Sequence, residues 1–348
     1  MNCHKRLSKL ILFLSFAVCG VVMSACTSQA ETAQSDADNE ANGNMLTLPE
    51  LTAVNLNHTP LKVVAGTSII GDVVAQVGSD AIQLTTLMGP GQDPHSYEPG
   101  AQTLTAVSKA HVIFLNGWDL EETLARNLET ISGSVPVVLI SANIEPLAFG
   151  EDVHTHTEDT EAVDEHQHGT VDPHVWFSIP NVKQWVENVQ IVLIELDPNN
   201  ADIYQANAQS YLAELDALAA YATAELAAIP AENRYLVTNH DAFGYFAHEY
   251  NFEMVGTVIP GMSTMAEPSA GDLSGLIAEM ERHHICTIFT ETTVSAILAQ
   301  TVANELEGCT QVQVMQLYTG AIGPAGSGAD SYIGMFRANV DAIVSGLQ

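Results

Sequence analysis

The chain has 348 residues, of which 42 are Asp or Glu and only 10 are Lys or Arg, so its formal net charge at pH 7 is −32. A surface this acidic repels phosphate, which excludes nucleic acid as a partner. The same charge attracts cations in general. Solubility or a salty habitat explains it equally well, so acidity alone does not indicate a metal site.

The N-terminus predicts export. A basic stretch, Lys5–Lys9, precedes the apolar run Leu10–Val22, which is too short for a stop-transfer helix and is typical of a signal peptide. The run ends in Met23-Ser24-Ala25-Cys26, which resembles a bacterial lipobox and predicts removal of residues 1–25 with a lipid on Cys26. The alternative is an ordinary secretory signal that happens to contain a cysteine. We expect an extracytoplasmic lipoprotein, in the periplasm or at the cell surface, with the membrane as a partner through that lipid.

Residues 26–57 are expected to form a flexible tether. Small and polar residues dominate most of this stretch, which cannot bury enough apolar surface to offset the entropy of ordering. The remaining body is longer than a usual single domain and predicts two lobes. We expect an N-terminal lobe over 58–180, connecting helices over 181–229 and a C-terminal lobe over 230–348.

Strand-like and helix-like runs alternate along the body, which predicts an α/β fold with a mostly parallel sheet flanked by helices in each lobe. The strands expected in the first lobe are Leu61–Ala65, Ala81–Leu87, Val112–Leu115 and Val135–Leu139. The helices expected there are Ile70–Val77, Leu104–Ala110 and Asp119–Leu128. Residues 149–172 then interrupt the pattern with an acidic, histidine-rich stretch, which predicts a solvated insertion.

Two helices are expected between the lobes. Pro180–Leu196 is the first, and Asp202–Ile229 is the second, without an internal Gly or Pro. At 1.5 Å per residue the second would span about 40 Å, enough for one rigid helix to join both lobes. The strands expected in the second lobe are Leu236–Thr238, Glu253–Ile259, Cys286–Thr290 and Val312–Leu317. The helices expected there are Phe243–Tyr250, Ser269–His283, Ile297–Glu307 and Tyr332–Leu347.

Two cysteines remain beyond Cys26 in the exported chain, Cys286 and Cys309. An oxidising compartment favours a disulfide between them, and both precede expected strands. Two inert buried thiols are the alternative.

Three histidines share an unusual setting at expected strand ends or loops, where open α/β sheets place ligands. Asp-Pro precedes both His95 and His174, and His240 stands in Thr238-Asn239-His240-Asp241. A neighbouring Asp could accept the second imidazole N–H and fix the tautomer, as metal-binding histidines require. A single such histidine is more often structural than a ligand, and spacing alone does not show that the three converge.

The chain resembles the zinc- and manganese-binding receptors of bacterial ABC transporters, the cluster A-I solute-binding proteins. The resemblance extends from about Leu61 to the C-terminus. The segments that carry it are Gly66–Asp72, Asp93–Pro99, Asp172–Trp176, His240–Phe246 and Asp330–Tyr332. It implies two α/β lobes joined by one long helix, with the metal buried between them. It also implies that His95, His174 and His240 are ligands.

One position departs from the family pattern. An Asp ligand is expected where Gly320 stands, and glycine has no side chain to bind a metal. Water, Glu291 or Asp330 could complete the coordination. Water is our first candidate, and Glu291 is the second and the candidate protein ligand, with a hydrogen bond behind another ligand as its structural alternative.

The ligand set bears on the metal. The resemblance implies His at the third position in many zinc receptors and Glu in many manganese receptors, and three imidazoles suit Zn²⁺ better than Mn²⁺. The family's zinc-associated members often carry a histidine-rich loop where residues 149–172 lie. An auxiliary zinc site in that loop would use His154, His156, His166 and His168. A solvated loop with incidental histidines is the alternative. Zinc affinity should fall below about pH 6.5, as the histidines become charged.

The prediction from the sequence is therefore a monomeric, non-enzymatic receptor that captures Zn²⁺ and delivers it to an ABC permease. The alternatives are a manganese receptor of the same family and a zinc-dependent hydrolase, because three histidines with an open position also describe catalytic zinc. A surface adhesin is a further class, but no residue pattern singles it out.

Overall fold

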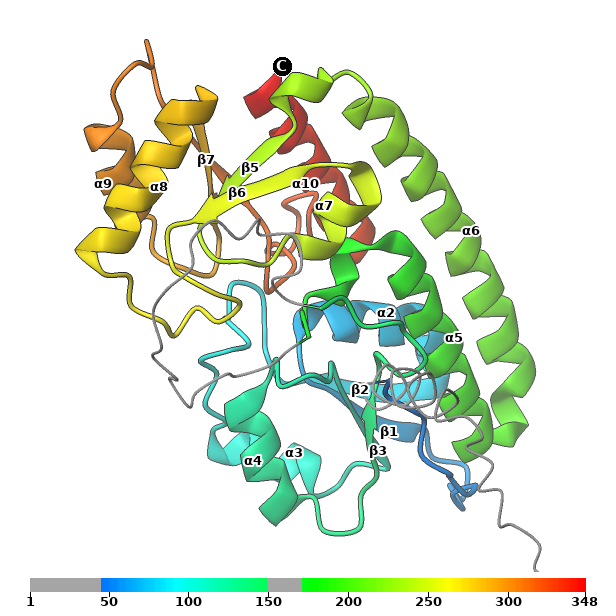
Figure 1. The fold of residues 1–348 in the computed structure, drawn as a ribbon. Helices are drawn as coiled ribbons and strands as arrows, with labels where there is room; N and C mark the ends of the chain where they lie inside the picture. Colours follow the sequence, from blue (N-terminus) through cyan, green and yellow to red (C-terminus); the bar gives the residue numbers. More distant parts are fainter. Residues whose placement is uncertain (1–44, 149–170) are drawn as a thin grey trace, which may run out of the picture. The chain divides into compact units, whose positions relative to one another are not determined.

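The computed structural model describes residues 45–148 and 171–348. The predicted signal peptide, Cys26, the first part of the tether and nearly all of the histidine-rich insertion lie outside these residues. The described chain builds two four-stranded parallel sheets flanked by helices, as the sequence predicts (Figure 1). We call the part built on each sheet the first lobe and the second lobe.

The first sheet has the strand order β2-β1-β3-β4. Its strands are β1 (Leu61–Ala65), β2 (Ile82–Thr86), β3 (Val112–Leu115) and β4 (Val137–Leu139). Its flanking elements are α2 (Ser68–Gly78), the 3₁₀ turn η1 (Ser79–Ala81), α3 (Ala101–Val107) and α4 (Glu122–Ile131). Every residue of β3 is buried, as expected for a central parallel strand covered on both faces.

The second sheet repeats this arrangement with the order β6-β5-β7-β8. Its strands are β5 (Tyr235–Thr238), β6 (Glu253–Thr257), β7 (Thr287–Glu291) and β8 (Gln313–Leu317). Its helices are α7 (Gly244–Tyr250), α8 (Ala270–His283), α9 (Ile297–Glu305) and α10 (Tyr332–Leu347). In each sheet the second strand along the chain lies on one side of the first, and the third strand lies on its other side. Parallel α/β sheets bind ligands at the carboxyl ends of the strands where the strand order switches in this way.

Helices connect the two sheets. The 3₁₀ turn η2 (Val175–Phe177) leads into α5 (Ile179–Leu196), and η3 (Pro198–Asn200) leads into α6 (Ala201–Leu226). The 3₁₀ turn η4 (Ala231–Asn233) precedes β5. Helix α6 packs against α2 and α5 on the first lobe and against α10 on the second (Figure 1). The large apolar core is continuous through these helices, so both lobes share it.

Several boundaries differ from the sequence prediction. Helix α3 begins directly after Gly100, three residues earlier than expected. Helix α4 begins later than Asp119, because Trp118 and Asp119 adopt positive φ angles of 47° and 57° that a right-handed helix cannot contain. The end of the predicted tether is also structured: the backbone N–H of Val54 donates to Leu196 at 2.8 Å, and neighbouring apolar residues pack on the core.

Cys286 and Cys309 form a disulfide with their Cα atoms 5.8 Å apart. It joins the start of β7 to the loop before β8. Within residues 45–148 and 171–348, none of the helices has the length and apolar character needed to cross a membrane.

Candidate metal centre

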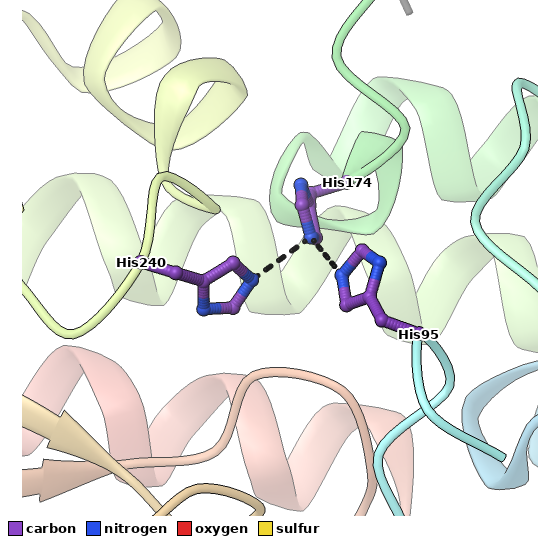
Figure 2. A group of neighbouring side chains, drawn as sticks. All are labelled: His95, His174 and His240. Carbon is purple, nitrogen blue, oxygen red and sulfur yellow. Dashed lines mark hydrogen bonds between the residues drawn. The ribbon is translucent and has the colours of Figure 1, made fainter. Parts of the chain in front are cut away.

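Three imidazole rings meet between the lobes. His95 comes from the loop after β2, His174 from the residue before η2, and His240 from the loop after β5 (Figure 2). The Nε2 atom of His174 lies 3.2 Å from Nε2 of His95 and 3.2 Å from Nε2 of His240. Among the described residues, these three form the group of His, Cys, Asp and Glu side chains whose ligand atoms all lie within 4.8 Å of one another.

His174 is oriented by a carboxylate in its own loop. One oxygen of Asp172 accepts both the backbone N–H of His174 at 2.9 Å and its ring Nδ1–H at 2.8 Å. The side-chain amide of Asn116, at the end of β3, donates to the carbonyl of Pro173 at 2.8 Å and fixes the same loop. Because Nδ1 of His174 carries the hydrogen in this bond, Nε2 is unprotonated in the neutral ring and its lone pair can bind a metal.

His240 is held in the same way by a residue far away in the sequence. Glu291, at the end of β7, uses Oε1 to accept the backbone N–H of His240 at 3.0 Å and also its Nδ1–H. The other oxygen of Glu291 accepts the hydroxyl of Thr319 at 2.6 Å. Because β5 and β7 are adjacent, their carboxyl ends bring His240 and Glu291 together.

His95 has no carboxylate behind its ring among the described residues; a carboxylate holds its backbone instead. Asp93 accepts the His95 backbone N–H at 3.0 Å with one oxygen and the Ser96 hydroxyl at 2.9 Å with the other. In the described part of the chain, no hydrogen bond is made by the Nδ1 atom of His95. His95 is partly exposed, whereas His174 and His240 are 1% and 2% exposed.

The electrostatics favour a cation at the point where the rings meet. Burial lowers the pKa of His174 well below its ordinary value, and His240 lowers it further. Burial also lowers the pKa of His95. For His240, burial opposes the charged form, but the charge and hydrogen bond of Glu291 outweigh it and raise the pKa. Two imidazole lone pairs facing each other at this distance repel unless a proton or a metal ion lies between them.

The whole folded body matches a known family. A family profile described as "ZnuA: Zinc-uptake complex component A periplasmic" matches residues 63–346. The chain belongs to the ZnuA family.

Relatives within the ZnuA family are named for binding either manganese or zinc. The chain is 35% identical over 288 residues to the "Manganese-binding lipoprotein MntA" of Halalkalibacterium halodurans, covering 82% of this chain and 88% of the relative. It is 33% identical over 293 residues to the "Zinc-binding protein TroA" of Treponema pallidum, covering 82% and 88%. A solved structure titled "Periplasmic zinc binding protein TroA from Treponema pallidum" superposes with a TM-score of 0.71 at 32% identity, covering 83% of this chain and 99% of that one.

In this ZnuA-family chain Glu291, the candidate protein ligand, lies behind the ring of His240. Its Oε1 atom bonds Nδ1 of His240, on the far side of the ring from Nε2. This position fits the alternative, a hydrogen bond to a histidine of the group. Asp330 accepts the backbone N–H of Gly326 at 2.7 Å and is not in the histidine group.

Gly320 packs against Pro94, the residue before His95. A Cβ atom built there would meet the Cδ atom of Pro94 at 2.6 Å, closer than real Cβ contacts come. The ring of Pro94 therefore fills the space into which a side chain at position 320 would extend.

Sequence reasoning missed two residues that link the lobes here. The indole N–H of Trp176 in the first lobe donates to the carbonyl of Thr319 in the second at 3.0 Å. The hydroxyl of Thr319 in turn holds Glu291. Only the position of Thr319 beside Gly320 could have signalled this role. The histidines His154, His156, His166 and His168 lie outside the described residues.

Proposed function

We propose that this protein is an extracytoplasmic receptor that binds Zn²⁺ through His95, His174 and His240 and delivers it to an ABC permease. One observation carries the proposal. His174 and His240 each have Nδ1 bonded to a buried carboxylate, so their Nε2 lone pairs converge from different lobes at a separation of 3.2 Å. Such carboxylate–histidine pairs orient metal ligands.

The donor set supports zinc as the cargo. The ligand atoms of the group are three imidazole nitrogens, without a carboxylate oxygen among them. A tetrahedral zinc ion with Zn–N bonds of about 2.0–2.1 Å places its nitrogen ligands about 3.3 Å apart, close to the separations found here. Mn²⁺ prefers oxygen ligands. Water would supply the fourth ligand.

A manganese receptor is the second candidate, because a relative of similar identity is named as a manganese-binding lipoprotein. Calorimetry on protein stripped of metal, with Zn²⁺ and Mn²⁺ added alone and in competition, separates the two. Zinc should displace bound manganese. Displacement of zinc by equimolar manganese would support the second candidate instead.

Transport fits these residues better than hydrolysis. Asp172 and Glu291, the buried carboxylates nearest the histidines, are both bonded to Nδ1 atoms and so lie behind the rings. A zinc hydrolase needs a base beside the metal-bound water. The zinc-loaded protein should therefore not hydrolyse ester or peptide substrates, and turnover that disappears in His240→Ala would contradict the proposal.

Membrane attachment through Cys26 is part of the proposal. It is supported by the lipobox-like Met23–Cys26 and by relatives named lipoproteins. Cells fed labelled palmitate should label the wild-type protein but not Cys26→Ala. Equal labelling would exclude this anchor.

A further inference from the structure

The segment that carries His95 is tied to the second lobe at one polar contact. Asp93 shares its carboxylate between its own loop and the opposite lobe: one oxygen accepts the His95 backbone N–H, and the other accepts the Thr264 hydroxyl at 2.6 Å. Thr264 lies 171 residues further along the chain, in the loop between β6 and α8. The hydroxyl therefore reaches across from the second lobe to the residue that shapes the backbone of His95.

The loop that carries Thr264 is anchored on the segment that carries His240. The backbone N–H of Asp241 donates to the carbonyl of Gly261 at 3.0 Å, and the N–H of Ile259 donates to Asn239 at 2.7 Å. These bonds lie on either side of His240. Hydrogen bonds therefore connect the His240 segment to the Thr264 loop, and the Thr264 hydroxyl connects that loop to Asp93 in the His95 segment.

The three histidines differ in what else restrains them. The ring of His174 is fixed by Asp172 and that of His240 by Glu291, each within one lobe. The ring of His95 has no such partner in the described part of the chain. Its place opposite the other rings depends on its backbone, which is set by Asp93 and by Pro94 packed against Gly320.

We propose that Thr264 is a positioning residue for metal retention: its hydrogen bond to Asp93 across the lobes holds His95 at the metal and slows metal release. The inference rests on the proposed function. A charge-assisted hydrogen bond of this kind is among the stronger single contacts in proteins. Its loss should leave the two buried ligands in place while letting the partly exposed one move away.

The test measures zinc dissociation. Full-length protein loaded with Zn²⁺ is mixed with excess EDTA, and the release rate is followed by stopped flow for wild type, Thr264→Val and Thr264→Ser. Thr264→Val keeps the shape but removes the donor, and we expect release about tenfold faster. Thr264→Ser keeps the hydroxyl and should restore a rate near that of wild type. Thr301→Val, the same change in α9, is the matched control and should have no effect.

A double-mutant cycle shows whether the hydroxyl acts through Asp93. In an Asp93→Ala background, adding Thr264→Val should change the release rate by less than about twofold, because the shared contact is already lost. A full tenfold effect in that background would overturn the proposed route.

The outcomes separate the two proposals. Equal release rates for Thr264→Val and wild type, or equally fast release by both Thr264 variants, would overturn the role of the hydroxyl. A wild-type protein that retains no Zn²⁺ would instead overturn the proposed function itself.

Discussion

His174 and His240 belong to different lobes, yet their Nε2 atoms lie 3.2 Å apart, and each ring is held from behind by a buried carboxylate. Hydrogen bonds at Nδ1 make Nε2 the lone-pair nitrogen in both rings. The folded chain therefore assembles a repulsive contact that a bound cation relieves. Much of what can be measured on this protein depends on that relationship.

Removal of any one imidazole should weaken zinc binding by more than about a hundredfold, because each supplies one of three protein ligands. The variants are His95→Ala, His174→Ala and His240→Ala, measured by calorimetry. His248→Ala, an exposed histidine on α7, is the control. Undiminished affinity in two of the three would refute the assignment of the ligands.

Glu291→Gln should reduce zinc affinity by about ten- to a hundredfold, because the carboxylate orients His240 and raises its basicity. The amide can still accept the N–H but has lost the charge. If Glu291 were itself a ligand, the bound metal would lose a coordination bond, and X-ray absorption would show the change. We expect the same nitrogen coordination in the variant as in wild type.

Zinc binding should release protons near pH 6.5. The pKa of His240 is raised, so in the metal-free protein this ring stays doubly protonated at pH values above the ordinary imidazole pKa of about 6.5. Zinc must displace the proton on Nε2. The pKa values of His95 and His174 are lowered, so these rings are already neutral there. Burial raises the pKa of Asp172 to about 7, which adds to the release. Calorimetry in two buffers of different ionisation enthalpy measures the release, and none at pH 6.5 would contradict this assignment.

Glu121 should make the metal-free protein less stable as pH rises. Its carboxylate accepts the Asn116 backbone N–H, and burial raises its pKa to about 7. A raised pKa stabilises the fold below the unfolded-state value, and this contribution is lost as pH rises through 7. Glu121→Gln should remove the dependence and gain up to about 3 kcal/mol relative to wild type by pH 8. Denaturant unfolding at pH 5 and pH 8 tests this, and a difference independent of pH would contradict it.

Gly320→Ala should weaken zinc retention, although it adds a single methyl group. The new Cβ would meet Pro94 at 2.6 Å, and Pro94 cannot yield without moving His95. We expect zinc affinity to fall several-fold with little loss of thermal stability. Gly275→Ala in α8 is the control, because a Cβ atom there would meet no other atom within 4 Å. Gly308→Ala is unsuitable, because its φ of 87° would itself strain an alanine. Equal affinity for Gly320→Ala and Gly275→Ala would show that the contact does not constrain the site.

Local sequence pattern predicted most of the helices and strands. Buried parallel strands such as Val112–Leu115 are continuous apolar runs, and the uninterrupted stretch that became α6 contains no Gly or Pro. Periodicity and composition act over a few residues, so they could be interpreted without a fold. The start of α4 was misplaced because Trp118 and Asp119 adopt positive φ angles, which local composition does not reveal.

The sequence by itself determined the α/β alternation and the three loop histidines, because both are properties of neighbouring residues. It did not determine what stands behind those histidines. Glu291 meets His240 across 51 residues, and Thr264 meets Asp93 across 171. Only the pairing of β5 with β7, and the packing of both lobes on shared helices, brings such residues together. That is why Glu291 could be named from the sequence only as a candidate ligand, whereas the tertiary structure shows its carboxylate bonded to Nδ1 of His240.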